Sequence, residues 1–171
     1  MANDELAEAI EIEAIKHLKA RYFRFLDTKR WDEWRLQFCD DCVFEGISTT
    51  FADADDFVAG IARQHARTRT VHHGHTPEIE LLTATTARGI WAMADYVTWP
   101  PDEPLASWAV DDEMHGFVGY GYYEEEYRRV IDGWRIARLR LTRIRVDPLR
   151  GPAAEPLPNL LAPSPDWLPL R

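Results

Sequence analysis

The amino-acid sequence predicts an α+β fold in which N-terminal helices pack against one face of a curved antiparallel sheet. The first observation is that apolar residues recur at three- and four-residue steps through the N-terminal part of the chain. The second is the change, after residue 77, to long segments in which apolar and polar residues alternate. The third is Asp132-Gly133, a pair typical of a tight turn between antiparallel strands. Helices followed by antiparallel strands favour the α+β class.

Three helices are predicted at the start of the chain. The first covers about residues 5–26, with apolar residues such as Ile10 along one stripe and charged residues such as Lys19 on the remaining faces. A short second helix around Trp31 and Trp34 ends near Asp40, and residues 42–45 then form a first strand. The third helix begins at Asp53, because carboxylates at a helix N-terminus complement the helix dipole.

Long strands are predicted after these helices, at residues 78–82, 88–99, 115–130 and 134–146, and Pro148 is expected to end the last one. In the strand at 88–99, Asp95 shares a face with Trp91, Met93 and Val97. Glycines in and near the strands suit the bends or bulges that curve a sheet. These glycines are Gly74, Gly89, Gly116, Gly119 and Gly121.

The sequence indicates one domain at residues 1–148, followed by a proline-rich segment at residues 149–171. With 171 residues and 46% hydrophobic content, the chain is long enough for one stable core. The prolines of 149–171 disfavour a regular helix or a central strand, which leaves a disordered tail or an extended arm lying on the domain. The connection at 100–113 is too long for a tight hairpin, a length typical of lids and binding loops.

The net charge of −9 argues against nucleic acid or an anionic membrane as a partner, because both select basic surfaces. No apolar run approaches the roughly 20 residues that cross a bilayer, and the N-terminus lacks the basic and then apolar plan of a signal peptide. We therefore expect a soluble, cytoplasmic protein. Cys39 and Cys42 form a lone C-x-x-C, for which buried thiols are expected rather than a zinc or redox site.

The residues best suited to acid–base chemistry are His72, His73 and His75, three histidines within four positions. A histidine cluster alone is more often a surface feature, so its neighbours matter. Asp27 ends the first helix, where the dipole disfavours a carboxylate. It needs another role, either as a cap on the next helix or as a partner across a pocket.

Three other polar residues have both a structural and a functional interpretation. Asp95 lies in an apolar strand, and a buried carboxylate must be paired, protonated or facing a cavity. Arg143 is a candidate partner, although it also belongs to an arginine-rich edge. Tyr22 lies on the apolar face of the first helix, where core packing is the usual role. A metal site on His73 and His75 lacks further ligands, so we expect no metal and no other cofactor.

Several segments also form a pattern together, including the run His72-His73-Gly74-His75-Thr76-Pro77-Glu78. The others are residues 12–19, 22–27, 31–33, 83–95, 127, 132–134 and 143–144. The pattern resembles SnoaL-like proteins of the nuclear-transport-factor-2-like superfamily, most specifically the bile acid 7α-dehydratases and more distantly the scytalone dehydratases. It covers residues 10–147 and implies a cone-shaped fold, with three N-terminal helices packed on a strongly curved antiparallel sheet.

The resemblance implies five site residues, which fall on Tyr22, Asp27, His72, Asp95 and Arg143. His72 would be the general base, and Asp27 would fix its tautomer. Tyr22 would hydrogen-bond the substrate oxygen, while Asp95 and Arg143 would complete the polar wall. The implied activity is that of a cofactor-independent dehydratase, a lyase that eliminates water from a small apolar substrate, a hydroxylated polycyclic ketone such as a steroid.

Two alternatives remain open, because a fold does not fix a function. One is a non-catalytic small-molecule-binding or assembly module, and the other is a related isomerase or cyclase. We also expect a homo-oligomer, a trimer as in these relatives, because an open sheet face bearing Trp134 and several tyrosines needs cover. The connection at 100–113 is longer than in the bile acid enzymes, so the identity of the substrate does not transfer.

Overall fold

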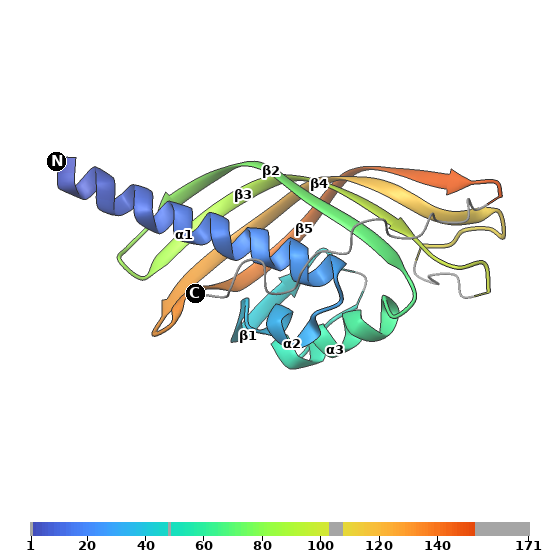
Figure 1. The fold of residues 1–171 in the computed structure, drawn as a ribbon, viewed down its shortest axis with the longest axis horizontal. Helices are drawn as coiled ribbons and strands as arrows, with labels where there is room; N and C mark the ends of the chain where they lie inside the picture. Colours follow the sequence, from blue (N-terminus) through green and yellow to red (C-terminus); the bar gives the residue numbers. More distant parts are fainter. Residues whose placement is uncertain (1, 48, 103–107, 153–171) are drawn as a thin grey trace.

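The computed structural model describes residues 2–47, 49–102 and 108–152. Its elements in chain order are α1 (Ala2–Asp27), α2 (Trp31–Arg35), β1 (Phe38–Glu45), α3 (Ala54–Gln64), β2 (Arg69–Leu81), β3 (Thr86–Thr98), β4 (Met114–Val130) and β5 (Gly133–Arg150). Figure 1 shows α1 lying along one face of a curled sheet, with α2 and α3 beside its C-terminal end. The predicted α+β class is confirmed.

The described sheet has five strands in the order β1-β5-β4-β3-β2, and it is mixed rather than antiparallel. β2, β3, β4 and β5 pair antiparallel, whereas β1 pairs parallel with β5. The expectation of an antiparallel sheet is therefore wrong at this edge. Parallel neighbours need a long crossover, and everything from α3 to β4 lies between these two strands in the sequence. The strand register shifts beside Gly74, Gly116 and Gly121, whereas Gly89 and Gly119 pair regularly.

Three predicted element boundaries are wrong, each for a local reason. β1 begins at Phe38, which the sequence placed in the preceding helix. β2 begins at Arg69, so the histidine run lies inside a strand rather than before one. As an edge strand with many exposed residues, β2 lacks a clear apolar alternation. β5 passes through Pro148 to Arg150; beyond Arg140 it has no described partner on the β1 side, and proline is tolerated on such an edge.

The main core lies between the helices and the concave face of the sheet. Its members from α1 include Ile15, Leu18 and Phe25, which are almost fully buried. Two assignments in α1 are corrected here. Ile10, expected on the apolar stripe, is 59% exposed, and Lys19, expected on a polar face, is fully buried. Figure 1 shows that the N-terminal end of α1 extends past the sheet.

The opposite face of the sheet carries no helix in the part of the chain that the structure describes (Figure 1). Tyr96, Tyr120 and Tyr122 on this face are 44%, 40% and 39% exposed. Trp134, by contrast, is buried, and its indole Nε1 donates to Glu11 of α1 at 2.7 Å. The expectation that Trp134 lies on the open face is therefore wrong.

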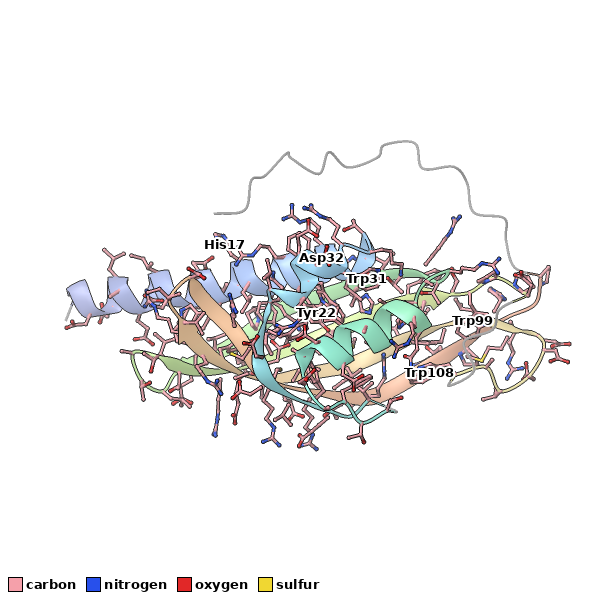
Figure 2. The ribbon with its side chains drawn as sticks, turned by 90° about the horizontal axis from the view of Figure 1, so that it is seen from below. His17, Tyr22, Trp31, Asp32, Trp99 and Trp108 are labelled. Atoms are coloured by element: carbon pink, nitrogen blue, oxygen red, sulfur yellow. The ribbon has the colours of Figure 1, made fainter. Side chains whose placement is uncertain are left out.

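A smaller apolar cluster forms at the far end of the sheet from Val97, Trp99, Met114 and Phe117, with Trp108 packed against it. Figure 2 shows Trp99 and Trp108 in this region, past the end of α3.

On the edge strand β1, Cys39 and Cys42 are buried free thiols, as expected, and burial raises the pKa of both. No described helix is long and apolar enough to span a membrane.

Candidate active site

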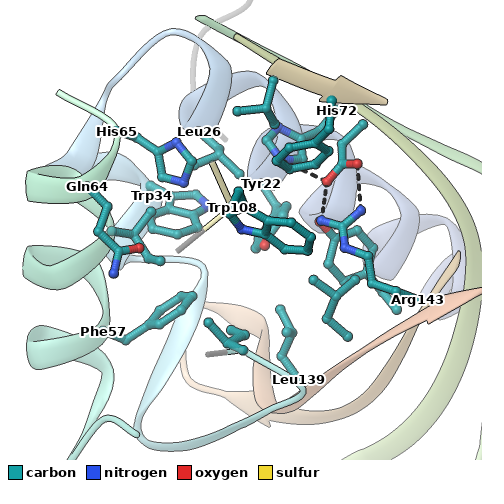
Figure 3. Close-up of a pocket in the computed structure, with 17 residues that line it drawn as sticks. Tyr22, Leu26, Trp34, Phe57, Gln64, His65, His72, Trp108, Leu139 and Arg143 are labelled. Carbon is teal, nitrogen blue, oxygen red and sulfur yellow. Dashed lines mark hydrogen bonds and ion pairs between the residues drawn. The ribbon is translucent and has the colours of Figure 1, made fainter. Parts of the chain in front are cut away.

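A cavity of about 100 Å³ lies between the C-terminal half of α1, α3 and the concave face of the sheet. Figure 3 shows the 17 side chains around it. Four of the five predicted site residues line it, namely Tyr22, His72, Asp95 and Arg143. The fifth, Asp27, sits behind His72, so the structure brings the whole predicted set together.

Asp27 is the last residue of α1, and its carboxylate accepts three hydrogen bonds from β2. Oδ1 accepts from the Thr70 hydroxyl at 2.8 Å and from Nδ1 of His72 at 2.7 Å, while Oδ2 accepts from the His72 backbone N–H at 2.8 Å. The helix-cap alternative is excluded, because the N-cap of α2 is Arg30 and has no side-chain cap. These bonds offset the unfavourable dipole at this end of α1.

The contact with Asp27 fixes the tautomer of His72. An ionised carboxylate can only accept, so the proton of the neutral imidazole must lie on Nδ1. Nε2 then carries the lone pair on the ring edge nearest Asp95, whose Oδ2 lies 4.0 Å away. That distance is too long for a hydrogen bond and leaves Nε2 available to a ligand. The His72 side chain is 9% exposed, so this basic nitrogen is mostly shielded from water.

Asp95 and Arg143 form a bidentate ion pair beside His72. Arg143 Nη1 donates to Oδ1 at 2.6 Å and Nη2 donates to Oδ2 at 2.5 Å. The Asp95 side chain is only 2% exposed, so the pairing with arginine considered from the sequence is present and supplies the required counter-charge. Gly119, opposite Asp95 on β4, makes room for the pair. A Cβ there would lie 2.0 Å from Nη1 of Arg143 and 2.3 Å from Oδ1 of Asp95.

Tyr22 lines the cavity and packs edge-on against Tyr123, with ring centroids 5.9 Å apart. Burial, followed by the neighbouring Tyr123 and Glu125, raises the pKa of Tyr22 well above its usual value. Its hydroxyl therefore stays protonated and remains a hydrogen-bond donor at neutral pH. Tyr22 thus packs in the core, as its apolar position suggested, and also faces the cavity.

A buried charged network lies beneath this tyrosine pair. Lys19 Nζ contacts Glu125 at 2.5 Å with both side chains fully buried, and Tyr127 donates to the other carboxylate oxygen at 2.5 Å. The same ammonium lies 3.9 Å from the ring centroid of Tyr22 and 3.7 Å from that of Tyr123. A cation over an aromatic face is attracted to it, so Lys19 holds both rings from behind.

Sequence reasoning missed other residues that line or shape the cavity. Trp108, from the 100–113 connection, lies with its ring centroid 5.3 Å from the guanidinium carbon of Arg143; residues 103–107 of that connection lie outside the described residues. Gln64 and His65, at the end of α3, face Arg143 from across the cavity (Figure 3). Thr70 was within reach of prediction, because it lies two residues before His72 and so on the same strand face.

The remaining histidines of the run, His73 and His75, are exposed. His73 pairs with Ala94 and points to the face opposite His72, as neighbouring residues of a strand must. Within residues 2–47, 49–102 and 108–152, no group of three or more His, Cys, Asp and Glu residues is arranged to hold a metal ion. His72 therefore faces the cavity, whereas its neighbour His73 lies on the opposite face of the sheet.

The fold and site define a protein in which helices cover a curled sheet and a histidine-centred polar cavity lies between them. The family model of the SnoaL-like domain matches residues 7–140, and the chain belongs to this family. The resemblance to SnoaL-like proteins that the sequence shows is thus confirmed at the level of the family. Among curated proteins, a "probable cyclase" of Gibberella zeae is 24% identical over 142 residues, which cover 76% of this chain and 89% of that protein.

Two solved structures illustrate the likeness. A "Putative Scytalone Dehydratase" from Novosphingobium aromaticivorans has a TM-score of 0.70 at 19% identity, covering 94% of this chain and all of that one. A hexachlorocyclohexane dehydrochlorinase, LinA type 2, has a TM-score of 0.68 at 17% identity, covering 91% of this chain and 98% of that one. At these identities the likeness establishes the fold alone.

Proposed function

We propose that the protein is a cofactor-independent lyase, a dehydratase that eliminates water from a hydroxylated cyclic ketone with His72 as the general base. The observation that supports this most directly is the His72–Asp27 pair, which leaves a basic Nε2 beside a shielded cavity. The relatives support the class, because dehydratase and dehydrochlorinase both name eliminations.

The proposed reaction needs one base and one hydrogen-bond donor. Nε2 of His72 takes the proton from the carbon next to the substrate carbonyl, and the C–H electron pair moves toward that carbonyl. The electrons then form the new C=C bond as the hydroxyl on the next carbon leaves. The imidazolium of His72 returns its proton to this hydroxide, so water is released and the base is restored. A carbonyl acidifies the proton removed, so a histidine base suffices without a metal.

The other site residues have supporting roles in this proposal. Asp27 holds the proton on Nδ1 and stabilises the imidazolium that forms. Tyr22 donates a hydrogen bond to the substrate oxygen as negative charge develops there. Asp95 and Arg143 form the polar wall, and Arg143 Nε is a buried donor that finds no partner among the described atoms.

The size of the cavity bears on the substrate. An engineered protein cavity of roughly 150 Å³ binds benzene, so a cavity of about 100 Å³ encloses one ring at most. We therefore propose that the reacting ring enters the cavity and that any further rings of a polycyclic substrate extend past Trp108. A steroid, the substrate class of the bile acid 7α-dehydratases, fits only if the cavity widens.

A cyclase or isomerase of the same fold is the second candidate, and the observation that favours it is the relative named "probable cyclase". Both reactions can begin with removal of the same acidic proton, so His72 and Tyr22 would keep their roles. The two candidates differ in the product, since only the dehydratase forms one water for each double bond.

Turnover of a panel of hydroxyketones with one, two and four rings tests the proposal, followed by mass spectrometry for loss of 18 Da. We expect turnover of at least one member, loss of that activity in His72→Ala, and full activity after exhaustive dialysis against a chelator. Activity restored only by added zinc would reject the metal-free mechanism. Binding without turnover would favour the non-catalytic module.

We further propose that the protein is a homo-oligomer, with a trimer as the expected state, assembled through the helix-free face of the sheet. Exposed apolar side chains from three strands share this face, among them Val71, Ile90, Tyr96, Tyr120 and Tyr122. Patches of this kind mark interaction surfaces. Light scattering should give about three times the chain mass at micromolar concentration, and a monomeric mass would reject the assembly.

A further inference from the structure

The second histidine of the cavity, His65, lies across it from the proposed reaction centre. His65 follows the last residue of α3, is half-buried, and lines the cavity together with Gln64. Figure 3 shows both side chains on the α3 side and Arg143 on the opposite side. None of the roles assigned so far uses His65.

A local pair of hydrogen bonds defines the tautomer of His65. Its Nδ1 lies 2.8 Å from Oγ1 of Thr68, and the same Oγ1 donates to the His65 backbone carbonyl at 3.3 Å. A hydroxyl has one proton, so both bonds form together only if Nδ1–H donates to Oγ1. Nε2 then holds a lone pair, and it makes no hydrogen bond within the described part of the chain. Thr68 is buried, which protects this arrangement from water.

His65 also stays neutral at physiological pH. Burial is the main cause that lowers its pKa to about 4, and electrostatic interactions with Lys29 and His72 lower it further. The carboxylates Asp95 and Asp27 oppose this shift without reversing it. A neutral imidazole with a free lone pair accepts a hydrogen bond from a hydroxyl, and it has no charge with which to hold an anion.

We propose that Nε2 of His65 accepts a hydrogen bond from a substrate hydroxyl that is not the leaving group, so that His65 determines specificity. An acceptor bound to the leaving hydroxyl would oppose its departure, because that oxygen must gain a proton. The substrate class is therefore a cyclic ketone with a second hydroxyl, alcoholic or phenolic, on the side away from His72. This inference rests on the proposed function for the orientation of the substrate, although the hydroxyl subsite can be tested without turnover.

Two matched probes test the subsite by binding alone: 1-tetralone and 6-hydroxy-1-tetralone, which differ by one phenolic hydroxyl and have no leaving group. Their dissociation constants are measured by quenching of tryptophan fluorescence for the wild type and for His65→Phe, which keeps a ring but removes both nitrogens. Because a neutral hydrogen bond contributes about 0.5–1.5 kcal/mol net, the hydroxyl should tighten binding to the wild type about two- to tenfold. That preference should disappear in His65→Phe.

Two further measurements separate this role from a merely structural one. In ¹⁵N-labelled protein, His65 should show a protonated Nδ1 and an unprotonated Nε2, with no titration between pH 5.5 and 8. Thr68→Val, which releases the tautomer without touching the cavity, should weaken the hydroxyl preference while leaving binding of 1-tetralone unchanged. An equal preference in His65→Phe, no binding of the hydroxylated probe, or a proton on Nε2 would each overturn the proposal. A protein that binds the probes selectively but turns over no ketone would contradict the proposed function and leave the subsite intact.

Discussion

Replacing Asp27 with asparagine should inactivate the protein while leaving it folded, and the hydrogen bonds of Asp27 show why. An amide has one accepting oxygen and one donating nitrogen in place of two accepting oxygens. The His72 backbone N–H cannot change its role, so the amide oxygen must take the position of Oδ2, with the NH₂ group in the position of Oδ1. There the NH₂ donates to the Thr70 hydroxyl and to Nδ1 of His72, provided that the imidazole proton moves to Nε2.

The asparagine variant should thus keep all three contacts and lose the proposed general base. With the proton on Nε2, the ring presents a donor where the reaction needs a lone pair. Loss of a positioned general base costs about 10²–10⁴ in rate, and trapping a catalytic histidine in the wrong tautomer costs roughly 10⁴ in the serine proteases. We therefore expect Asp27→Asn to lower kcat on the order of 10²- to 10⁴-fold, with a change in unfolding free energy below about 1 kcal/mol.

Three measurements check this on the hydroxyketone that the wild type turns over. Steady-state kinetics give kcat, urea unfolding gives stability, and ¹⁵N spectra of labelled histidine report which nitrogen of His72 carries the proton. His72→Ala should lose about as much activity as Asp27→Asn, and the double variant should fall little further, because members of one unit are strongly non-additive. Additive losses, or an asparagine variant that keeps its proton on Nδ1 and its rate, would refute the reasoning.

Other perturbations test the surrounding structure. Gly119→Ala should displace the Asp95–Arg143 pair, which should destabilise the fold by about 1–3 kcal/mol in urea unfolding and lower turnover. Gly89→Ala is the control, because its added Cβ would come no closer than 3.2 Å to another atom. Lys19→Met should cost about 3–5 kcal/mol by leaving Glu125 buried without its cation, and adding Glu125→Gln should recover part of that loss in the same assay. Because the pKa of His65 is lowered to about 4 from 6.5, the unfolded chain binds more protons between these values. The stability present above pH 6.5 should then be lost as the pH falls. Between pH 7.5 and 5, the unfolding free energy of the wild type should drop by about 2 kcal/mol relative to that of His65→Phe. Equal pH profiles of the two proteins would contradict this.

The parts of the site that the sequence could predict are those with a local anomaly. Asp27 stood at the wrong end of a helix dipole, and Asp95 was the lone charge between Gly89 and Val97, so each required a partner. The structure supplies these partners as His72 and Arg143. Arg143 itself was ambiguous, because only the sheet register shows which arginine of that edge faces inward. The edge consists of Arg138, Arg140, Arg143 and Arg145.

Other features depend on contacts between distant segments that no local pattern reveals. The parallel pairing of β1 with β5 joins residues about a hundred positions apart. Lys19 resembles any polar residue of an amphipathic helix, and its burial becomes favourable only because Glu125 approaches from β4. His65 has an ordinary place at a helix end, and its role depends on a cavity wall that Trp108 and Arg143 close from the other side.

The buried charges around the cavity form a pattern with a consequence for catalysis. Asp95 is matched by Arg143 and Glu125 by Lys19, so each of these pairs is close to neutral. Asp27 receives its hydrogen bonds from Thr70 and His72, and it interacts electrostatically with Lys29. None of the described ion pairs joins it to a lysine or arginine. Its negative charge is therefore available to the imidazolium that the proposed reaction forms on His72, where low exposure to water strengthens the attraction. By the same reasoning, introducing a cation beside Asp27 should slow proton removal even if every hydrogen bond of the pair survives.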